Sequence, residues 1–441
     1  MKSMKLSIIV FLLFQLLFLG CLPRPATPDL SRHSDDSNPG IDPPTPGKGT
    51  DPGTQDPDNP SVGSNPVDPA GPGSTPVTTG GVAKAPLVQT SPRFDEVTWL
   101  TSHNAFVNKG DEPGWLVENQ SRSLQYQLDN GVTAFMLDIH VDAGQAVLCH
   151  GKCSGFPSNL YKKMDLIAYL NRIGDFLNKH PEAILTVIFE DYTGINELRA
   201  ALDKAPSFRD RIYDPYKADV RNKGWPRLDA MIKDNKRLLV ISDRSDKKDL
   251  GVAYAQDFTV ENYWSLGKEG KDIICKTRWD NIPLNRTDGK FAYLFVMNHF
   301  RDIPTSAFSA ADNKIDVLWS RINDQCSPAA EKKANFLAVD HFDEADWGAR
   351  KVVAELNERV AIVYADNDLK GKMQMLKPGK YLAKDLSFGE DQINSIKVSA
   401  KSRVKLYADD NYKNLLIELT EDSKNLGDKA DKASSIIVER E

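Results

Sequence analysis

Apolar runs of strand length recur along the chain from about Phe94 onward, and most of them are continuously apolar rather than alternating. That pattern is typical of strands that are covered on both faces, as in a parallel sheet. Helix-like stretches lie between many of the runs, for example from Met164 to His180, where apolar residues recur at helical spacing. About seven or eight such strand–helix units predict an α/β fold, a (β/α)8 barrel over residues 87–365.

Each apolar run ends in polar residues. The candidates are His103, Asn104, Asp138, His140, His150, Glu190, Asp243, Arg244, Asn298 and Asp340. In a parallel barrel the carboxyl ends of the strands share one rim, so we expect these side chains to converge there. For any single position the alternative is a strand-end residue that simply meets solvent. The whole set predicts one mouth that holds histidines together with several carboxylates.

Four of these segments carry a family resemblance. Thr101–Phe106 (TSHNAF), Gly131–Asp138 (GVTAFMLD), Leu148–His150 (LCH) and Val187–Tyr192 (VIFEDY) resemble the X-region of phosphatidylinositol-specific phospholipase C. The likeness is greatest to the PLC-like phosphodiesterases of plants, fungi and bacteria, and it covers about residues 94–360. It implies a distorted TIM barrel and a phosphoric diester hydrolase that acts on a phospholipid or another phosphodiester.

The resemblance also implies roles for single residues. His103 and His150 match the two histidines that the family uses for proton transfer and phosphate stabilisation, and an imidazole can act as either acid or base near neutral pH. Asp340 is expected to orient His103, as a carboxylate orients a catalytic imidazole, or else to cap a loop. His140, Asp243, Arg244 and Asn298 are expected either to contact substrate or to be structural.

A divalent metal is expected in the barrel. Asn104, Asp138 and Glu190 match the positions at which metal-dependent members bind a cation, and oxygen ligands suit Ca²⁺ or Mg²⁺. The chain departs from that pattern at Met136, where those members carry a glutamate. Metal-independent members place an arginine where this chain has His140. A non-catalytic cell-surface lipoprotein that binds glycan or calcium, with chemistry lost through Met136, is therefore the alternative function.

The N-terminus is expected to be a lipoprotein signal peptide over residues 1–21. Lys2 and Lys5 precede an apolar run from Leu6 to Gly20, which is too short to cross a bilayer core of roughly 30 Å. Phe18–Cys21 (FLGC) resembles the lipobox of bacterial lipoproteins, which implies lipidation of Cys21. The protein is then exported and anchored to a membrane of the cell envelope or surface; an ordinary secretory signal is the alternative.

Residues 22–86 are expected to form a disordered tether. They hold 15 of the chain's 26 prolines and have no Phe, Tyr or Trp, so they cannot bury enough apolar surface to offset chain entropy. The net charge of -6 argues against a nucleic-acid partner. No protein partner is predicted.

The other four cysteines are expected to form disulfides, because an even number in an exported chain favours pairing. Proximity in sequence favours Cys149 with Cys153 and Cys275 with Cys326. A zinc site at Cys149, His150 and Cys153 is the alternative, but it lacks a fourth ligand.

The C-terminal region, residues 373–441, contains an internal repeat: Asp391–Val398 recurs 40 positions later as Asp431–Val438. Such a repeat indicates two copies of one supersecondary unit. With Tyr381 and Phe388-Gly389, it resembles the paired Greek keys of a βγ-crystallin domain, which implies a small all-β sandwich. Members of that family often bind Ca²⁺, here through Asp391, Ser395, Asp431 and Ser435; a purely structural sandwich is the alternative.

Overall fold

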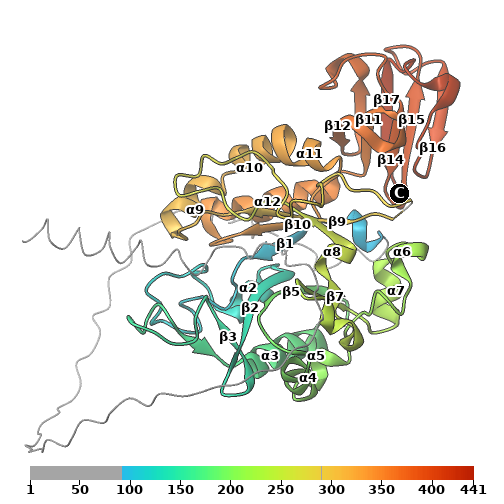
Figure 1. The fold of residues 1–441 in the computed structure, drawn as a ribbon. Helices are drawn as coiled ribbons and strands as arrows, with labels where there is room; N and C mark the ends of the chain where they lie inside the picture. The colour runs from blue at the N-terminus through green and yellow to red at the C-terminus, as the bar shows by residue number, and fades with distance from the viewer. Residues whose placement is uncertain (1–91, 290) are drawn as a thin grey trace, which may run out of the picture. The chain divides into compact units, whose positions relative to one another are not determined.

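The computed structural model describes residues 92–289 and 291–441. Eight parallel strands pair in the order β7-β6-β5-β2-β1-β10-β9-β8 and curl into a barrel with helices outside them (Figure 1). The strands are β1 (Trp99–Ser102), β2 (Ala134–Asp142), β5 (Leu185–Asp191), β6 (Leu238–Ser242), β7 (Ala253–Tyr254), β8 (Thr259–Glu261), β9 (Leu294–His299) and β10 (Phe336–Val339). Among the described residues no ladder joins β7 to β8, so the barrel is open at that seam. The predicted signal peptide, Cys21 and the tether lie outside the described residues.

The strands are buried along their length, as their apolar sequences predict. Every residue of β1, β6, β9 and β10 is buried, because the barrel interior covers one face and helices cover the other. The α/β barrel prediction is confirmed. The helices are α2 (Leu124–Asp129), α3 (Leu166–Lys179), α4 (Ile195–Asp203), α5 (Pro206–Arg209), α6 (Val220–Lys223), α7 (Leu228–Lys233), α8 (Ala255–Phe258), α9 (Ser306–Asp312), α10 (Ile315–Arg321), α11 (Ser327–Ala330) and α12 (Glu344–Glu358).

Helix α3 illustrates how local sequence sets an element. Asp165 is its N-cap, and the carboxylate accepts a hydrogen bond of 3.1 Å from the backbone N–H of Ala168. Leu170, Ile173 and Leu177 recur at helical spacing and are buried against the sheet side of the helix. The helix ends at His180, its C-cap.

Strand β2 extends beyond the barrel and turns back on itself. Its last four residues pair antiparallel with β3 (Gln145–Cys149), which in turn pairs with β4 (Lys163–Met164). The apolar run that precedes His150, Ala146–Cys149, is therefore a hairpin strand, which corrects the expectation that His150 ends a parallel strand. Residues 143 and 144 both have positive φ, which is the backbone that a two-residue hairpin turn requires.

The C-terminal part is all-β, as predicted, and consists of two antiparallel sheets. One sheet has the order β12-β11-β14 and the other β13-β17-β15-β16. Their bounds are β11 (Ala361–Asp366), β12 (Lys370–Leu376), β13 (Gly379–Leu382), β14 (Ser395–Val398), β15 (Ser402–Tyr407), β16 (Leu415–Leu419) and β17 (Ser435–Arg440). The all-β part therefore begins with β11, a strand that the sequence-based boundary at residue 365 assigned to the barrel.

Strand β11 has two apolar faces. Ile362 and Tyr364 join the hydrophobic cluster of the barrel, while Ala361 and Val363 join that of the C-terminal sheets. Because side chains alternate along a strand, one short segment contributes to both cores.

Both predicted cysteine pairs, Cys149 with Cys153 and Cys275 with Cys326, are disulfide-bonded. The pairing of Cys149 removes the thiolates that the alternative zinc site would need. Within the described ranges, no helix has the length and apolarity that crossing a membrane requires.

Candidate functional site

The parallel register brings the polar residues that follow the strands to one rim. Asp138 of β2 is the register partner of Glu190 on β5, and Asn298 of β9 is the partner of Ala338 on β10. His103 directly follows β1 and Asp340 directly follows β10, and these two strands also pair. The strand register therefore brings Asp138 next to Glu190, and the segment with His103 next to the segment with Asp340.

His103 is held in one orientation from two sides. Its Nδ1 lies 2.9 Å from Oδ1 of Asp340, and its ring stacks on Phe300 with centroids 3.6 Å apart and planes 5° apart. The side-chain amide of Asn119 donates to the same Asp340 oxygen at 2.9 Å. Asp340 is buried, so its carboxylate favours a proton on Nδ1 and leaves Nε2 of His103 with a lone pair.

His150 follows β3, next to the disulfide of Cys149, so the hairpin and the disulfide fix its position. Burial, together with the charges of His103 and His140, lowers the pKa of His150 to about 4, while Glu190 and Asp340 oppose the shift. The charges of His103, Glu190 and Asp340 all act on the His150 imidazole.

Three acidic residues of the rim, Asp138, Glu190 and Asp243, interact electrostatically with one another. Burial raises the pKa of Asp138 well above its ordinary value, and the charges of Glu190 and Asp243 raise it further. Burial likewise raises the pKa of Asp243 to about 6. Negative charge is therefore concentrated where water cannot solvate it, which is unfavourable unless positive charge lies close by.

Arg278 supplies part of that positive charge. Its guanidinium donates to Glu261 Oε1 at 2.8 Å, and Glu261 also accepts from the amide of Asn298 at 2.8 Å. Burial alone would lower the pKa of Arg278, but the charges of Glu261 and Glu190 raise it above its ordinary value. The residue lies in the irregular segment between β8 and β9, and no motif in the sequence indicated it.

The three residues expected to bind a divalent metal all carry oxygen atoms in their side chains. Asp138 and Glu190 are register neighbours, and the buried Oδ1 of Asn104 has no hydrogen-bond partner among the described residues. Oxygen atoms of this kind suit Ca²⁺ or Mg²⁺. Met136 contributes no oxygen, and within the described ranges no group of three or more His, Cys, Asp and Glu residues is arranged to hold a metal. A divalent cation at this place would therefore need the amide oxygen of Asn104 as a ligand, in addition to the two carboxylates.

The other predicted rim residues differ in their contacts and burial. The ring of His140 stacks on Tyr192 with centroids 4.4 Å apart, and the Tyr192 hydroxyl donates to Glu190. Arg244 is largely exposed and lies 3.9 Å from Asp246. Asn298, by contrast, is fully buried, and its amide donates to Glu261 and to the backbone of Asn262. The amide nitrogen of Asn298 thus positions Glu261, while its Oδ1 has no hydrogen-bond partner among the described residues.

The repeat residues of the C-terminal sheets have equivalent environments. Asp391 and Asp431 both have positive φ. Ser395 donates its hydroxyl to the carbonyl of Asp366, and Ser435 donates to that of Asp409, each at 2.5 Å. Both serines therefore fix the start of a strand by the same bond, which supports the predicted repeat.

Sequence reasoning did not find Asn119, Phe300, Glu261 or Arg278. Asn119 and Arg278 lie in irregular segments, so neither follows an apolar run. Glu261 and Phe300 do end or follow strands, β8 and β9. β8 is only three residues long, which is too short to stand out as an apolar run.

A family model described as PI-PLC X 1 matches residues 90–357. A PI-PLC X domain-containing protein of Arabidopsis thaliana is 32% identical over 295 residues, which cover 62% of this chain and 65% of that protein. An uncharacterized secreted protein of Arthroderma benhamiae is 26% identical over 283 residues, which cover 60% of this chain and 61% of that protein. The chain thus spans less than two thirds of the length of either relative.

Among solved structures, the N-terminal domain of Protein S is 28% identical and covers 18% of this chain and 96% of its own, with a TM-score of 0.18. A βγ-crystallin domain from Flavobacterium johnsoniae is 29% identical and covers 18% of this chain and 94% of its own, with a TM-score of 0.18.

The His150 imidazole should stay neutral down to about pH 4, because burial disfavours its charged form. Between pH 6.5 and 4 the unfolded chain then binds more protons at this residue than the folded chain. The corresponding stability is present above pH 6.5 and is lost as the pH falls to about 4, by at most about 3 kcal/mol. NMR of the ring nitrogens measures the midpoint, and the His150→Gln variant assigns the signal. A midpoint near 6.5 would contradict the environment described above.

Proposed function

Because this chain belongs to the PI-PLC X domain family, we propose that it is a phosphoric diester hydrolase of the phospholipase C type, which cleaves a phospholipid-like phosphodiester. The observation that carries this proposal is the contact of His103 with the buried Asp340, within electrostatic reach of His150. A phosphodiester cleavage needs a base, an acid and positive charge at the phosphoryl oxygens.

His103 acts as the base in this proposal. With the Nδ1 proton held by Asp340, its Nε2 accepts the proton of an attacking hydroxyl, either from the substrate itself or from water. The hydroxyl oxygen forms a bond to phosphorus as that proton leaves. Phe300 keeps the ring from rotating, so the lone pair stays aimed while the substrate binds.

His150 acts as the acid. In the protein without substrate it is neutral, because burial holds its pKa at about 4. A bound phosphodiester brings a negative charge close to the imidazole, which favours the protonated form. The protonated ring then donates to the leaving alkoxide as the second phosphorus–oxygen bond breaks, so one proton is taken up by His103 and one is delivered by His150.

We further propose that Asn104, Asp138 and Glu190 hold Ca²⁺ or Mg²⁺. Support comes from the unpartnered Asn104 oxygen and from the raised pKa of Asp138, since a cation next to it would favour the ionised carboxylate. Such an ion supplies positive charge to the phosphoryl oxygens when it is bound.

The C-terminal domain has four candidate calcium ligands, which are Asp391, Ser395, Asp431 and Ser435. There the structural role of the two serine hydroxyls favours the sandwich without an ion.

We also propose that the protein is exported and anchored through a lipidated Cys21, so that a membrane is its partner and the natural source of its substrate. The charged and apolar N-terminus supports this, and so do the two disulfides, which persist in oxidising compartments. One relative is described as secreted.

Replacing His103 with Ala should lower kcat/KM on a chromogenic phosphodiester by about 10²- to 10⁴-fold, because the base is removed. Asp340→Asn should lower it as well, since the amide no longer favours the required tautomer. His180→Ala, which alters the C-cap of α3, is the matched control and should keep the wild-type rate. Equal turnover in His103→Ala and wild type would leave only the glycan- or calcium-binding alternative.

Calcium should raise the thermal midpoint of the full chain by about 5 °C at a hundredfold excess over Kd, because the ion binds only the folded state. Glu190→Gln should lose this shift, whereas Asp391→Asn should keep it and so separates the barrel from the C-terminal repeat. The metal assignment is wrong if Glu190→Gln keeps the whole shift and EDTA leaves turnover unchanged.

Changing Cys21 to Ser should move the protein from the detergent phase to the aqueous phase in phase partitioning with a nonionic detergent, because the acyl chains are lost. Cys153→Ser is the control: it removes a cysteine without touching the lipobox. A wild-type chain that partitions into water would contradict the anchor and support an ordinary secretory signal.

A further inference from the structure

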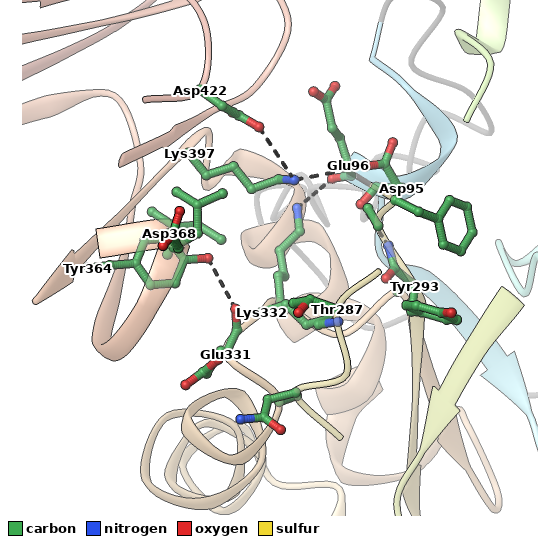
Figure 2. Close-up of a pocket in the computed structure, with 18 of the residues that line it drawn as sticks. Asp95, Glu96, Thr287, Tyr293, Glu331, Lys332, Tyr364, Asp368, Lys397 and Asp422 are labelled. Carbon is green, nitrogen blue, oxygen red and sulfur yellow. Dashed lines mark hydrogen bonds and ion pairs between the residues drawn. The ribbon is translucent and has the colours of Figure 1, made fainter. Parts of the chain in front are cut away.

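A cavity of about 160 Å³ lies between the barrel and the C-terminal sheets (Figure 2). The barrel contributes Glu96 and Lys332 to its lining, and the C-terminal sheets contribute Lys397, Asp422 and Lys424. Lys332 precedes β10, whereas Asp340 follows the same strand. The cavity is therefore at the amino ends of the strands, at the opposite end of the barrel from the proposed catalytic residues.

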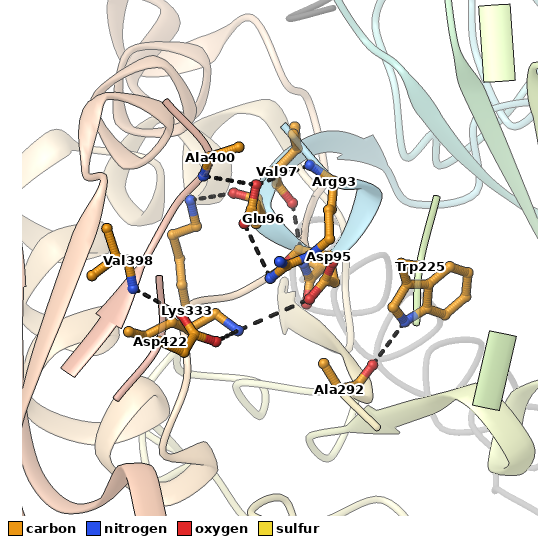
Figure 3. Close-up of polar contacts among 12 residues, drawn as sticks. Arg93, Asp95, Glu96, Val97, Trp225, Ala292, Lys333, Val398, Ala400 and Asp422 are labelled. Atoms are coloured by element: carbon orange, nitrogen blue, oxygen red, sulfur yellow. Dashed lines mark hydrogen bonds and ion pairs between the residues drawn. The ribbon is translucent and has the colours of Figure 1, made fainter. Parts of the chain in front are cut away.

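Three carboxylates of this cavity, those of Asp95, Glu96 and Asp422, already have partners (Figure 3). Arg93 lies 3.2 Å from Asp95 and 3.1 Å from Glu96, and the second oxygen of Glu96 accepts from the backbone N–H of Arg93 at 2.9 Å. Asp422 accepts from the backbone N–H of Val398 at 2.8 Å. Hydrogen bonds of these lengths satisfy charged oxygens.

The ammonium groups of three lysines in this cavity have only long contacts with acceptors. Among the contacts of the described residues, the nearest acceptor of Lys332 Nζ is the carbonyl of Arg286 at 3.5 Å, and that of Lys424 Nζ is the carbonyl of Gly289 at 3.5 Å. Lys397 Nζ lies 3.9 Å from the carboxylates of Asp95 and Asp422. An ammonium group has three donors, and normal N–H···O bonds are about 2.7 to 3.2 Å long.

Lys333 shows that a neighbouring lysine of the same loop can be satisfied by the protein alone. Its Nζ donates to the carbonyl of Glu96 at 2.7 Å and to that of Leu356 at 3.2 Å. Lys332 points into the cavity instead, where burial and the charge of Lys397 lower its pKa to about 8. The charge of Glu331 opposes this shift. Lys332, Lys397 and Lys424 thus bring to the cavity three ammonium groups whose contacts in the described part of the chain are all 3.5 Å or longer.

We propose that this cavity binds a small tetrahedral oxyanion of the phosphate class, held by Lys332 of the barrel and by Lys397 and Lys424 of the C-terminal sheets. The size is suitable, because a cavity of about 150 Å³ accommodates a six-atom benzene ring and a phosphate has five heavy atoms. The oxyanion is bonded from both domains, so its binding stabilises their association. The site is separate from the proposed catalytic site and does not depend on it.

Isothermal titration calorimetry of the full chain with inorganic phosphate tests this site, with chloride holding the ionic strength constant. We expect saturable binding by the wild type. Lys332→Gln and Lys397→Gln should each weaken it by about tenfold or more, because each removes a charged hydrogen bond. Lys413→Gln, an exposed lysine of the same C-terminal domain, is the matched control and should bind like the wild type.

Three outcomes would overturn the proposal. These are no saturable binding by the wild type, unchanged affinity in both lysine variants, and binding that is lost in His103→Ala, which would assign the ion to the barrel mouth. If a buried lysine variant fails to fold, Lys424→Gln keeps the test valid, because that side chain is exposed. A parallel titration with glycerol 3-phosphate distinguishes a free ion from the phosphate group of a small monoester, and binding of either supports the site.

Discussion

The parallel, in-register pairing of the barrel strands is the constraint on which the rest of this molecule depends. It places Asp138 beside Glu190 and brings the segment after β1 next to the segment after β10. Backbone hydrogen bonds between neighbouring strands set that register, and the apolar side chains on both faces bury the strands. The polar rim is therefore assembled by residues that are themselves apolar and lie deep in the core.

That assembly concentrates charge where solvent is scarce. Asp138 and Asp243 are destabilised as carboxylates, and Arg278 with Glu261 offsets part of the cost from the other side of the rim. Charge arrangements of this kind weaken a fold slightly and are characteristic of sites that bind or transform a ligand. The buried Asp340 differs from them, since its hydrogen bonds to Asn119 and His103 satisfy one oxygen within the protein.

The sequence predicts the barrel and several of its rim residues. The rim residues that it does not predict share a physical cause. Strand ends carry a local signal, an apolar run followed by a polar residue, so His103, Glu190 and Asp340 could be predicted. Asn119 and Arg278 reach the rim from irregular segments, whose paths depend on tertiary contacts that no local pattern encodes. The run Ala146–Cys149 was misassigned because a buried hairpin strand and a buried parallel strand have the same apolar composition.

The alternation of side chains along β11 limits how this architecture can be altered. Ile362 and Tyr364 are embedded in one core while Ala361 and Val363 belong to the other, and the Tyr364 hydroxyl donates to the carbonyl of Glu331 in the barrel. If the chain were divided before β11, the barrel would lose the side chains of Ile362 and Tyr364 from its core. If it were divided after β11, the C-terminal sheets would lose those of Ala361 and Val363. The strand is therefore a shared structural element, and replacing either half would require the core of the other half to be repacked.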